Sequence, residues 1–172
     1  APCHFGLEKV LSFELKSLGA QNIVASDGHV CFYGDESLLA RTNICLATAE
    51  RVGIIVGKFR AETFNELFSG VYKLPLEQFV GRLDAFPNKG YSLNSKLTSI
   101  PACQSIIKKA MARRLGEHYG MSILEESGEK LRFQFSIVKD EVTIVLDTSG
   151  EGLHKRGYRR NSTEAPIKET LA

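Results

Sequence analysis

The sequence predicts an α+β fold. Its N-terminal part has the pattern of a helix, a β-hairpin, a second helix and a strand, and a long helix followed by two alternating strands comes later. The chain has 172 residues, of which 43% are apolar and 24% charged, as is typical of a globular protein with its own core. No apolar run approaches the roughly 20 residues of a membrane-spanning helix, so no membrane partner is expected.

The N-terminal elements follow from apolar spacing and from turn residues. Phe5 to Leu18 is predicted to be an amphipathic helix, and Gly19 follows it as a C-cap. Its apolar residues at helical spacing are Leu7, Val10, Leu11, Phe13, Leu15 and Leu18. Asp27-Gly28 lies between two apolar runs and predicts a tight hairpin, because both central residues of such a turn need positive φ.

A helix over 35–46 and a strand over 51–60 complete the first group of elements. A ferredoxin-like unit would need one more strand in front of the first helix. The sequence before Phe5 is too short to supply it, so we expect this strand to be missing.

A second unit is predicted after residue 60. Thr63 and Glu66 have the spacing of a capping box at a helix start. Ser99, with Pro101 in the first turn, predicts the start of a long helix. The predicted elements are helix 63–72, strand 82–86, helix 99–119, and the strands 131–137 and 142–146 joined by a turn at 139–141.

The residue types that carry catalysis or bind metals do not form recognisable patterns. The four cysteines and four histidines are scattered, and none has zinc-site or catalytic spacing. Reduced, structural thiols in a cytoplasmic protein are therefore expected. Gly150-Glu151-Gly152 lacks the third glycine of a dinucleotide fingerprint. No catalytic residue, cofactor site or metal site is expected in this chain.

Basic residues cluster in two places although the net charge is only +2. Local concentration sets the field that a polyanion meets, so the small total does not exclude nucleic acid. On the long helix the cluster contains Lys108, Lys109, Arg113 and Arg114. After the last strand it contains His154, Lys155, Arg156, Tyr158, Arg159 and Arg160. Guanidinium groups can bind phosphate through two hydrogen bonds, and an aromatic ring can stack on an unpaired base.

Both clusters also have a simpler interpretation. The segment after the last strand can be a solvated linker whose charges maintain solubility, and composition alone does not choose between the two. For the helix, taken alone, an ordinary solvated face is the favoured interpretation, because exposed positions are where Lys and Arg usually lie. All ten residues are nevertheless the candidates for RNA contact.

Several segments resemble the THUMP-containing guanine-N2 RNA methyltransferases, which include bacterial 23S rRNA enzymes. The most specific matches are Asp147-Thr148-Ser149-Gly150, Leu153-His154-Lys155-Arg156-Gly157-Tyr158-Arg159 and Ala165-Pro166-Ile167-Lys168-Glu169-Thr170-Leu171-Ala172. Phe5-Gly6-Leu7-Glu8 and Glu14-Leu15 match as well. Ala47 departs from the pattern, since the family often has arginine there, which puts a role of that helix in RNA contact in doubt.

The resemblance implies a truncated ferredoxin-like domain over 1–60, a THUMP RNA-binding domain with a mixed sheet and flanking helices over 61–164, and the start of a linker helix over 165–172. The parent enzyme would methylate guanine N2 in 23S rRNA. Its S-adenosylmethionine would bind to a methyltransferase domain absent from this chain, so the expected partners are structured RNA and that domain. The alternatives are a module of a tRNA-modifying enzyme, either a guanine-N2 methyltransferase or a 4-thiouridine synthetase, and a protein-docking domain for the catalytic domain.

Overall fold

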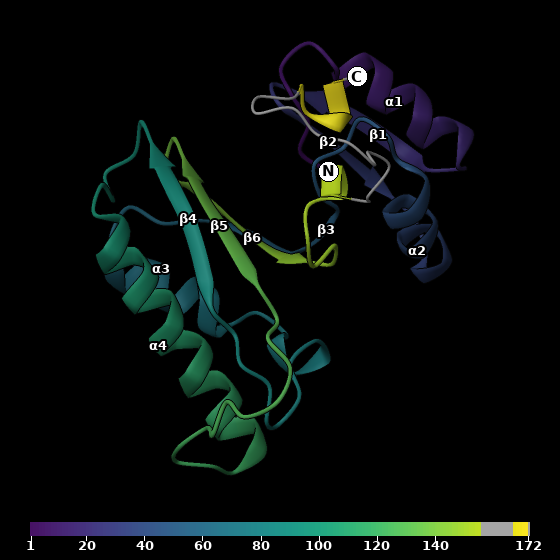
Figure 1. Cartoon of the computed structure of the whole chain (residues 1–172). Helices are drawn as coiled ribbons and strands as arrows, with labels where there is room; N and C mark the ends of the chain where they lie inside the picture. Colours follow the sequence, from purple (N-terminus) through teal and green to yellow (C-terminus); the bar gives the residue numbers. More distant parts are fainter. Residues whose placement is uncertain (156–166, 172) are drawn as a thin grey trace. The chain divides into compact units, whose positions relative to one another are not determined.

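The chain forms two compact units in a computed structural model that describes residues 1–155 and 167–171 (Figure 1). Unit 1 comprises Ala1–Gly53 and the described residues from Thr148 onward, and unit 2 comprises Ile54–Asp147. Each unit combines helices with a sheet, so the predicted α+β class is confirmed.

This division differs from the predicted boundaries at residues 60 and 164. Strand β3 (Gly53–Arg60) joins the sheet of unit 2 rather than closing the first domain. The segment from Thr148 returns to unit 1 rather than ending the second domain. Both differences have the same cause, because hydrogen bonds to residues distant in sequence decide where each segment belongs.

Unit 1 is built from two helices and a hairpin: α1 (Glu8–Ser17), β1 (Gln21–Ser26), β2 (His29–Tyr33) and α2 (Glu36–Cys45). The hairpin turns at the predicted place, where Ser26 pairs with His29. Of the two central residues only Gly28 has positive φ (73°), so the expectation of positive φ at both was wrong for Asp27. Asp35 caps α2 by accepting a hydrogen bond from the backbone N–H of Leu38.

The first three residues form backbone hydrogen bonds with the hairpin on one side and with the segment before β3 on the other. The sequence did not predict this pairing. The backbone N–H of Cys3 donates to the carbonyl oxygen of Gly28 at 2.9 Å, and the N–H of Val30 donates to the carbonyl oxygen of Ala1 at 2.8 Å. On the other side, the N–H of Glu50 donates to the carbonyl oxygen of Pro2 at 2.9 Å. This short segment pairs in the way expected of the strand predicted to be missing, although it forms isolated bridges only.

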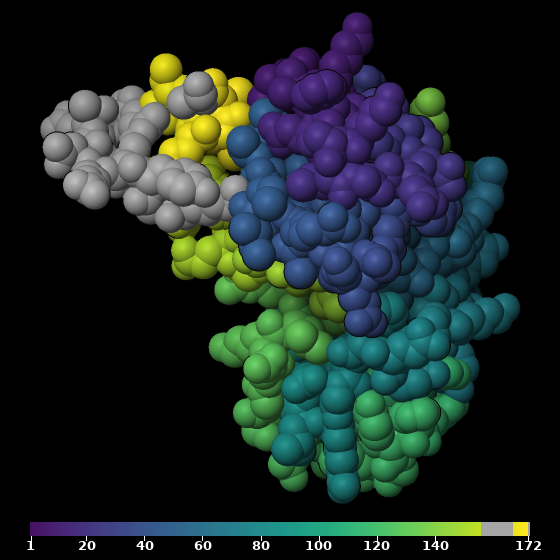
Figure 2. Space-filling view, turned by 90° about the vertical axis from the view of Figure 1, so that its right-hand side faces the viewer, coloured from purple at the N-terminus to yellow at the C-terminus, as the bar shows by residue number. Residues whose placement is uncertain are grey.

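The core of unit 1 draws on residues from both ends of the chain. Its buried members are Cys3, Leu11, Leu15, Val30, Leu46, Ala49, Val52 and Leu153. Leu153 belongs to the short helix η2 (Leu153–Lys155), and η3 (Glu169–Leu171) contacts η2. Figure 2 shows η3, in yellow, beside the purple and blue N-terminal residues.

Unit 2 is a four-stranded mixed sheet with helices on one face (Figure 1). The strand order is β3-β6-β5-β4, in which β4 and β5 are parallel and β5 and β6 antiparallel. Its other elements are α3 (Phe64–Tyr72), the short helix η1 (Leu76–Gln78), β4 (Asn88–Leu93), α4 (Ile100–Tyr119), β5 (Phe133–Val138) and β6 (Glu141–Asp147).

The predicted strand over 82–86 is wrong. Ala85 makes only an isolated bridge to Lys130, and Phe86 enters the core from a loop. The strand is β4, six residues that alternate between half-buried and exposed positions. The prediction failed because Ala85 and Phe86 are buried within a loop, and a buried loop residue is of the same apolar type as a buried strand residue.

The core of unit 2 lies between the sheet and the helices. Phe133, Ile137 and Ile144 of the sheet are almost fully buried against Ile107 and Met111 of α4. The predicted capping box at the start of α3 is present, since Thr63 accepts from the N–H of Glu66 and the Glu66 side chain accepts from the N–H of Thr63.

Candidate nucleic-acid interface

The basic cluster on α4 is largely engaged in contacts within unit 2. Lys108 Nζ lies 2.6 Å from a carboxylate oxygen of Glu126 and 3.6 Å from the centre of the Phe86 ring. The other two pairs are Arg113–Glu117 at 2.9 Å and Arg114–Glu77 at 2.5 Å. Lys109 is exposed. Three of the four predicted RNA-contacting residues on this helix therefore already have a carboxylate partner, which reduces the positive field that a phosphate would meet.

The ion pair between Arg114 and Glu77 is the most strongly coupled of these contacts. The hydrogen bonds from the Arg114 guanidinium, together with a backbone hydrogen bond, lower the pKa of Glu77 from 4.5 to about 2. A carboxyl group with a depressed pKa in the folded state contributes stability above its unfolded pKa. That contribution is present above about pH 4.5 and is lost as the pH falls through about 2.

Replacing Arg114 by methionine is expected to raise the pKa of Glu77 back towards 4.5 and to lower the stability of unit 2 at neutral pH. A carbon-detected NMR titration of the glutamate carboxyl groups measures the shift directly. Arg113→Met is the matched control, because it removes the same charge from an exposed pair one residue away. A Glu77 pKa that is unchanged in Arg114→Met would contradict the coupling.

The segment after β6 is held to unit 1 by side-chain hydroxyl groups. The Thr148 hydroxyl donates to the carbonyl oxygen of Val52 at 2.9 Å, and the Thr148 backbone N–H donates to the same oxygen at 3.0 Å. The Ser149 Oγ accepts the N–H of Val52 at 2.7 Å and donates to Oδ1 of Asn43 at 2.8 Å. A serine or threonine in this part of the junction pattern therefore fixes where the chain leaves the sheet, a role that spacing alone did not indicate.

Glu50 connects the beginning and the end of the junction. Its carbonyl oxygen accepts the N–H of Leu153 at 2.9 Å. One carboxylate oxygen lies 2.9 Å from Nζ of Lys168 and 2.9 Å from Nε2 of His4. The Lys168 hydrogen bond, with smaller contributions from His4 and His154, lowers the pKa of Glu50. Sequence reasoning missed Glu50, because nothing local marks it as a partner of residues more than a hundred positions away.

His154 is half-buried rather than displayed on the surface. Its ring packs so closely on Gly152 that a Cβ there would lie 2.6 Å from the ring carbon Cε1. It is one of the groups that lower the pKa of the Glu50 carboxyl. Lys155, by contrast, is exposed. The remaining predicted residues, Arg156, Tyr158, Arg159 and Arg160, lie outside the described residues. Residues 167–171 of the predicted linker helix are described, and they contain only the short helix η3.

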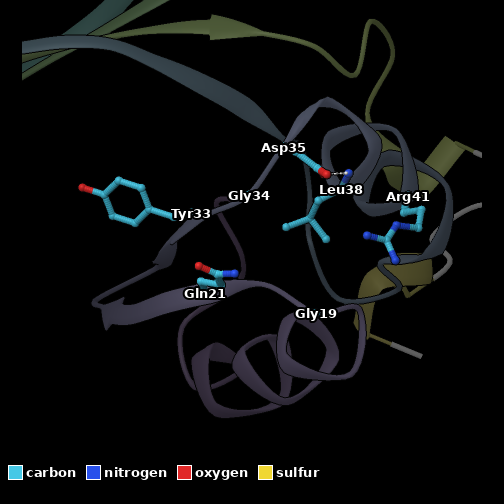
Figure 3. Close-up of a pocket in the computed structure, with 7 residues that line it drawn as sticks. All are labelled: Gly19, Gln21, Tyr33, Gly34, Asp35, Leu38 and Arg41. Atoms are coloured by element: carbon cyan, nitrogen blue, oxygen red, sulfur yellow. Dashed lines mark hydrogen bonds between the residues drawn. The ribbon is translucent and has the colours of Figure 1, made fainter.

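A shallow hollow of about 410 Å³ lies elsewhere in unit 1 (Figure 3). Its lining residues are Gly19, Gln21, Tyr33, Gly34, Asp35, Leu38 and Arg41. The Asp35 carboxylate is already used to cap α2 at 2.7 Å, and the Tyr33 ring points away from Leu38 and Arg41. Its polar groups therefore do not converge on one point, as the groups of a small-molecule site would.

Across 1–155 and 167–171, no group of three or more His, Cys, Asp or Glu side chains is placed to hold a metal ion. None of the helices within these ranges is both long enough and apolar enough to cross a bilayer.

The fold and the junction agree with comparisons to known proteins. Residues 1–53 match the family model described as the RlmL ferredoxin-like domain. The chain is 41% identical over its whole length to the putative RNA methyltransferase YpsC of Bacillus subtilis, of which it covers 45%. It is 30% identical over 97% of its length to the ribosomal RNA large subunit methyltransferase K/L of Syntrophotalea carbinolica, of which it covers 24%. The chain thus spans less than half the length of these relatives.

Solved structures agree with this relationship. A predicted N6-adenine-specific DNA methylase from Listeria monocytogenes is 46% identical, with a TM-score of 0.94 over 99% of this chain and 45% of its own. The putative methyltransferase SMU.472, solved in complex with SAH, is 39% identical with a TM-score of 0.93 over the same shares of the two chains.

The family-model match supports the predicted ferredoxin-like domain over residues 1–53, and the mixed sheet of unit 2 follows it in the chain. Over nearly its whole length the chain is similar to proteins named as RNA methyltransferases.

Proposed function

We propose that this chain is the RNA-binding part of an S-adenosylmethionine-dependent RNA methyltransferase. The observation that carries the proposal is the 41% identity over the whole chain to a protein named as an RNA methyltransferase. The name of the more distant relative, a ribosomal RNA large subunit methyltransferase, favours ribosomal RNA as the substrate class. The junction pattern adds the finer proposal of guanine N2 in 23S rRNA.

The RNA contacts in this proposal come from the junction rather than from all ten predicted residues. Lys155, Arg156, Arg159 and Arg160 supply positive charge, Tyr158 supplies an aromatic ring, and Lys109 adds an exposed cation on α4. Lys108, Arg113 and Arg114 contribute less, because an RNA phosphate would have to replace an existing carboxylate partner. His154 positions the start of the junction instead of binding phosphate.

The chemistry of methyl transfer is assigned to a part of the enzyme that this chain does not cover. The relatives are more than twice as long as the part this chain covers, and a related structure contains SAH. We assign the S-adenosylmethionine site and the catalytic groups to the remaining part of the enzyme. The role of this chain is then to bind structured RNA in the cytoplasm and to orient it, chiefly through phosphate contacts that carry no sequence information.

Three other functions remain as candidates for the experiment to distinguish. The resemblance also covers tRNA-modifying enzymes. The name of the Listeria protein points to DNA as a substrate class. A protein-docking domain would use the basic junction to bind the catalytic domain rather than nucleic acid.

Fluorescence-anisotropy titrations with a ribosomal RNA hairpin, a tRNA and a DNA duplex, each at several salt concentrations, test the proposal. We expect salt-dependent binding with a preference for ribosomal RNA over tRNA and over DNA. Preferential binding to tRNA would make tRNA, rather than ribosomal RNA, the substrate class. Preferential binding to the duplex would favour DNA. No RNA binding even at low salt would overturn the proposed function and leave the docking domain.

A further inference from the structure

The outward face of α1 exposes two large apolar side chains. Phe13 is 74% exposed and Val10 is 46% exposed, although the apolar spacing of the sequence placed both in the buried face of the helix. The helix buries Leu11 and Leu15 instead. A phenylalanine this exposed on a well-formed helix contributes little to packing in unit 1. Its position therefore indicates a contact with another molecule or domain.

The two carboxylates of α1 are occupied by neighbouring backbone. Glu8 accepts hydrogen bonds from the N–H of Gly6 at 2.8 Å and of Gly28 at 2.9 Å. Glu14 accepts from the N–H of Ala47 at 3.1 Å and of Thr48 at 3.4 Å. Each carboxylate therefore compensates backbone donors of a loop, and its charge is directed towards unit 1 rather than towards Phe13.

The two cations of α1 flank Phe13. Lys9 lies four residues before it and Lys16 three residues after it, so all three share one face of the helix. The rise of an α-helix separates the two lysine Cα atoms by about 10 Å along the axis. Both lysines are exposed. The outward face of α1 is therefore an aromatic ring between two positive charges.

We propose that this face binds an unpaired stretch of RNA, with a base stacked on Phe13 and the flanking phosphates bound by Lys9 and Lys16. The inference rests on the proposed function, which it deepens by assigning a second RNA contact away from the junction. An exposed ring stacks on any base, and lysines beside it follow the backbone, which is the combination that single-strand-binding proteins use. A duplex would present only its phosphates to this face and would leave Phe13 without a partner.

The test uses oligouridine RNA and three variants of the chain. Phe13→Ala is expected to weaken oligouridine binding about 5- to 150-fold, the range measured for the loss of one stacked base. The double variant Lys9→Ala/Lys16→Ala is expected to lower the slope of log affinity against log salt by about 1.4 units. Tyr158→Ala provides the comparison with the aromatic residue of the junction.

A fluorescence reporter tests stacking directly. The chain contains no tryptophan, so Phe13→Trp introduces a single indole. Stacking on uracil should quench its emission. Val24→Trp is the matched control, because Val24 is 59% exposed while the adjacent Ile23 packs against the core of the same unit. Thermal unfolding of every variant verifies that the exposed substitutions leave the fold intact.

The outcomes separate this inference from the proposed function. One outcome is that the unmodified chain binds ribosomal RNA while the Phe13 and lysine variants bind oligouridine with the same affinity as the unmodified chain. In that case the α1 site is wrong and the proposed function stands. Equal quenching of the indole at positions 13 and 24 would also overturn the α1 site. If the unmodified chain binds no RNA, both fail, and the apolar face of α1 is a protein contact.

Discussion

RNA affinity is expected to fall about a thousandfold at 0.1 M salt when four basic residues of the junction are replaced together by alanine: Lys155, Arg156, Arg159 and Arg160. Each phosphate contact contributes roughly 0.7 to 0.9 units to the slope of log affinity against log salt, so four lost contacts remove about three units. The loss should shrink as salt rises, because counterion release then contributes less. Anisotropy titrations of the ribosomal RNA hairpin at four or more salt concentrations measure both quantities.

A change of net charge by itself could weaken binding, so the control removes the same charge elsewhere. Four exposed lysines of unit 2 serve this purpose: Lys58, Lys73, Lys89 and Lys130. This variant should keep most of the affinity and most of the slope. The junction would lose its assigned role if both quadruple variants had the same slope, or if the junction variant kept the slope of the unmodified chain.

Gly90→Ala is expected to destabilise unit 2 by about 3 kcal/mol, at the upper end for overpacked positions. A Cβ at Gly90 would lie 2.0 Å from the carbonyl oxygen of Phe135 and 2.5 Å from its Cγ. The oxygen belongs to the backbone of β5, to which β4 is paired in parallel register, so no side-chain rotation relieves the contact. The edge strand β4 must shift away from β5 or detach.

Urea unfolding followed by circular dichroism measures the effect, and amide hydrogen exchange locates it. Loss of protection should begin in β4 and β5, while α1 and β2 of unit 1 keep theirs. Lys89→Ala is the control, because Lys89 is exposed on the same strand and its truncation creates no contact. If Gly90→Ala and Lys89→Ala unfold at the same urea midpoint, β4 does not need the close approach of Gly90 to Phe135.

Local chemistry determined the elements that the sequence predicted correctly. The hairpin at Asp27-Gly28 and the capping box of Thr63 and Glu66 each depend on residues within a few positions of one another. The alternating strands β5 and β6 were predictable for the same reason, since one face of each is buried. The junction pattern is also local, and it carries the resemblance to RNA methyltransferases without any tertiary contact.

Long-range contacts decided the rest. Local periodicity did not distinguish the strand β4 from the apolar loop before it, because pairing with β5 and the close approach at Gly90 select β4. Arg114 resembles a free surface base until its partner Glu77, 37 residues away, is placed beside it. Val10 and Phe13 have the spacing of core residues, yet within α1 the fully buried side chains are those of Leu11 and Leu15.

The sequence by itself determined the α+β class, most of the elements and the resemblance to RNA methyltransferases, because periodicity, turn residues and short motifs are local properties. Only the tertiary structure decided which basic side chains lack a carboxylate partner among the described residues and which apolar residues lie outside the core. It also returned the segment after β6 to unit 1 through Ser149, Leu153 and Lys168. These outcomes depend on contacts between residues far apart in the chain, which local sequence patterns do not predict.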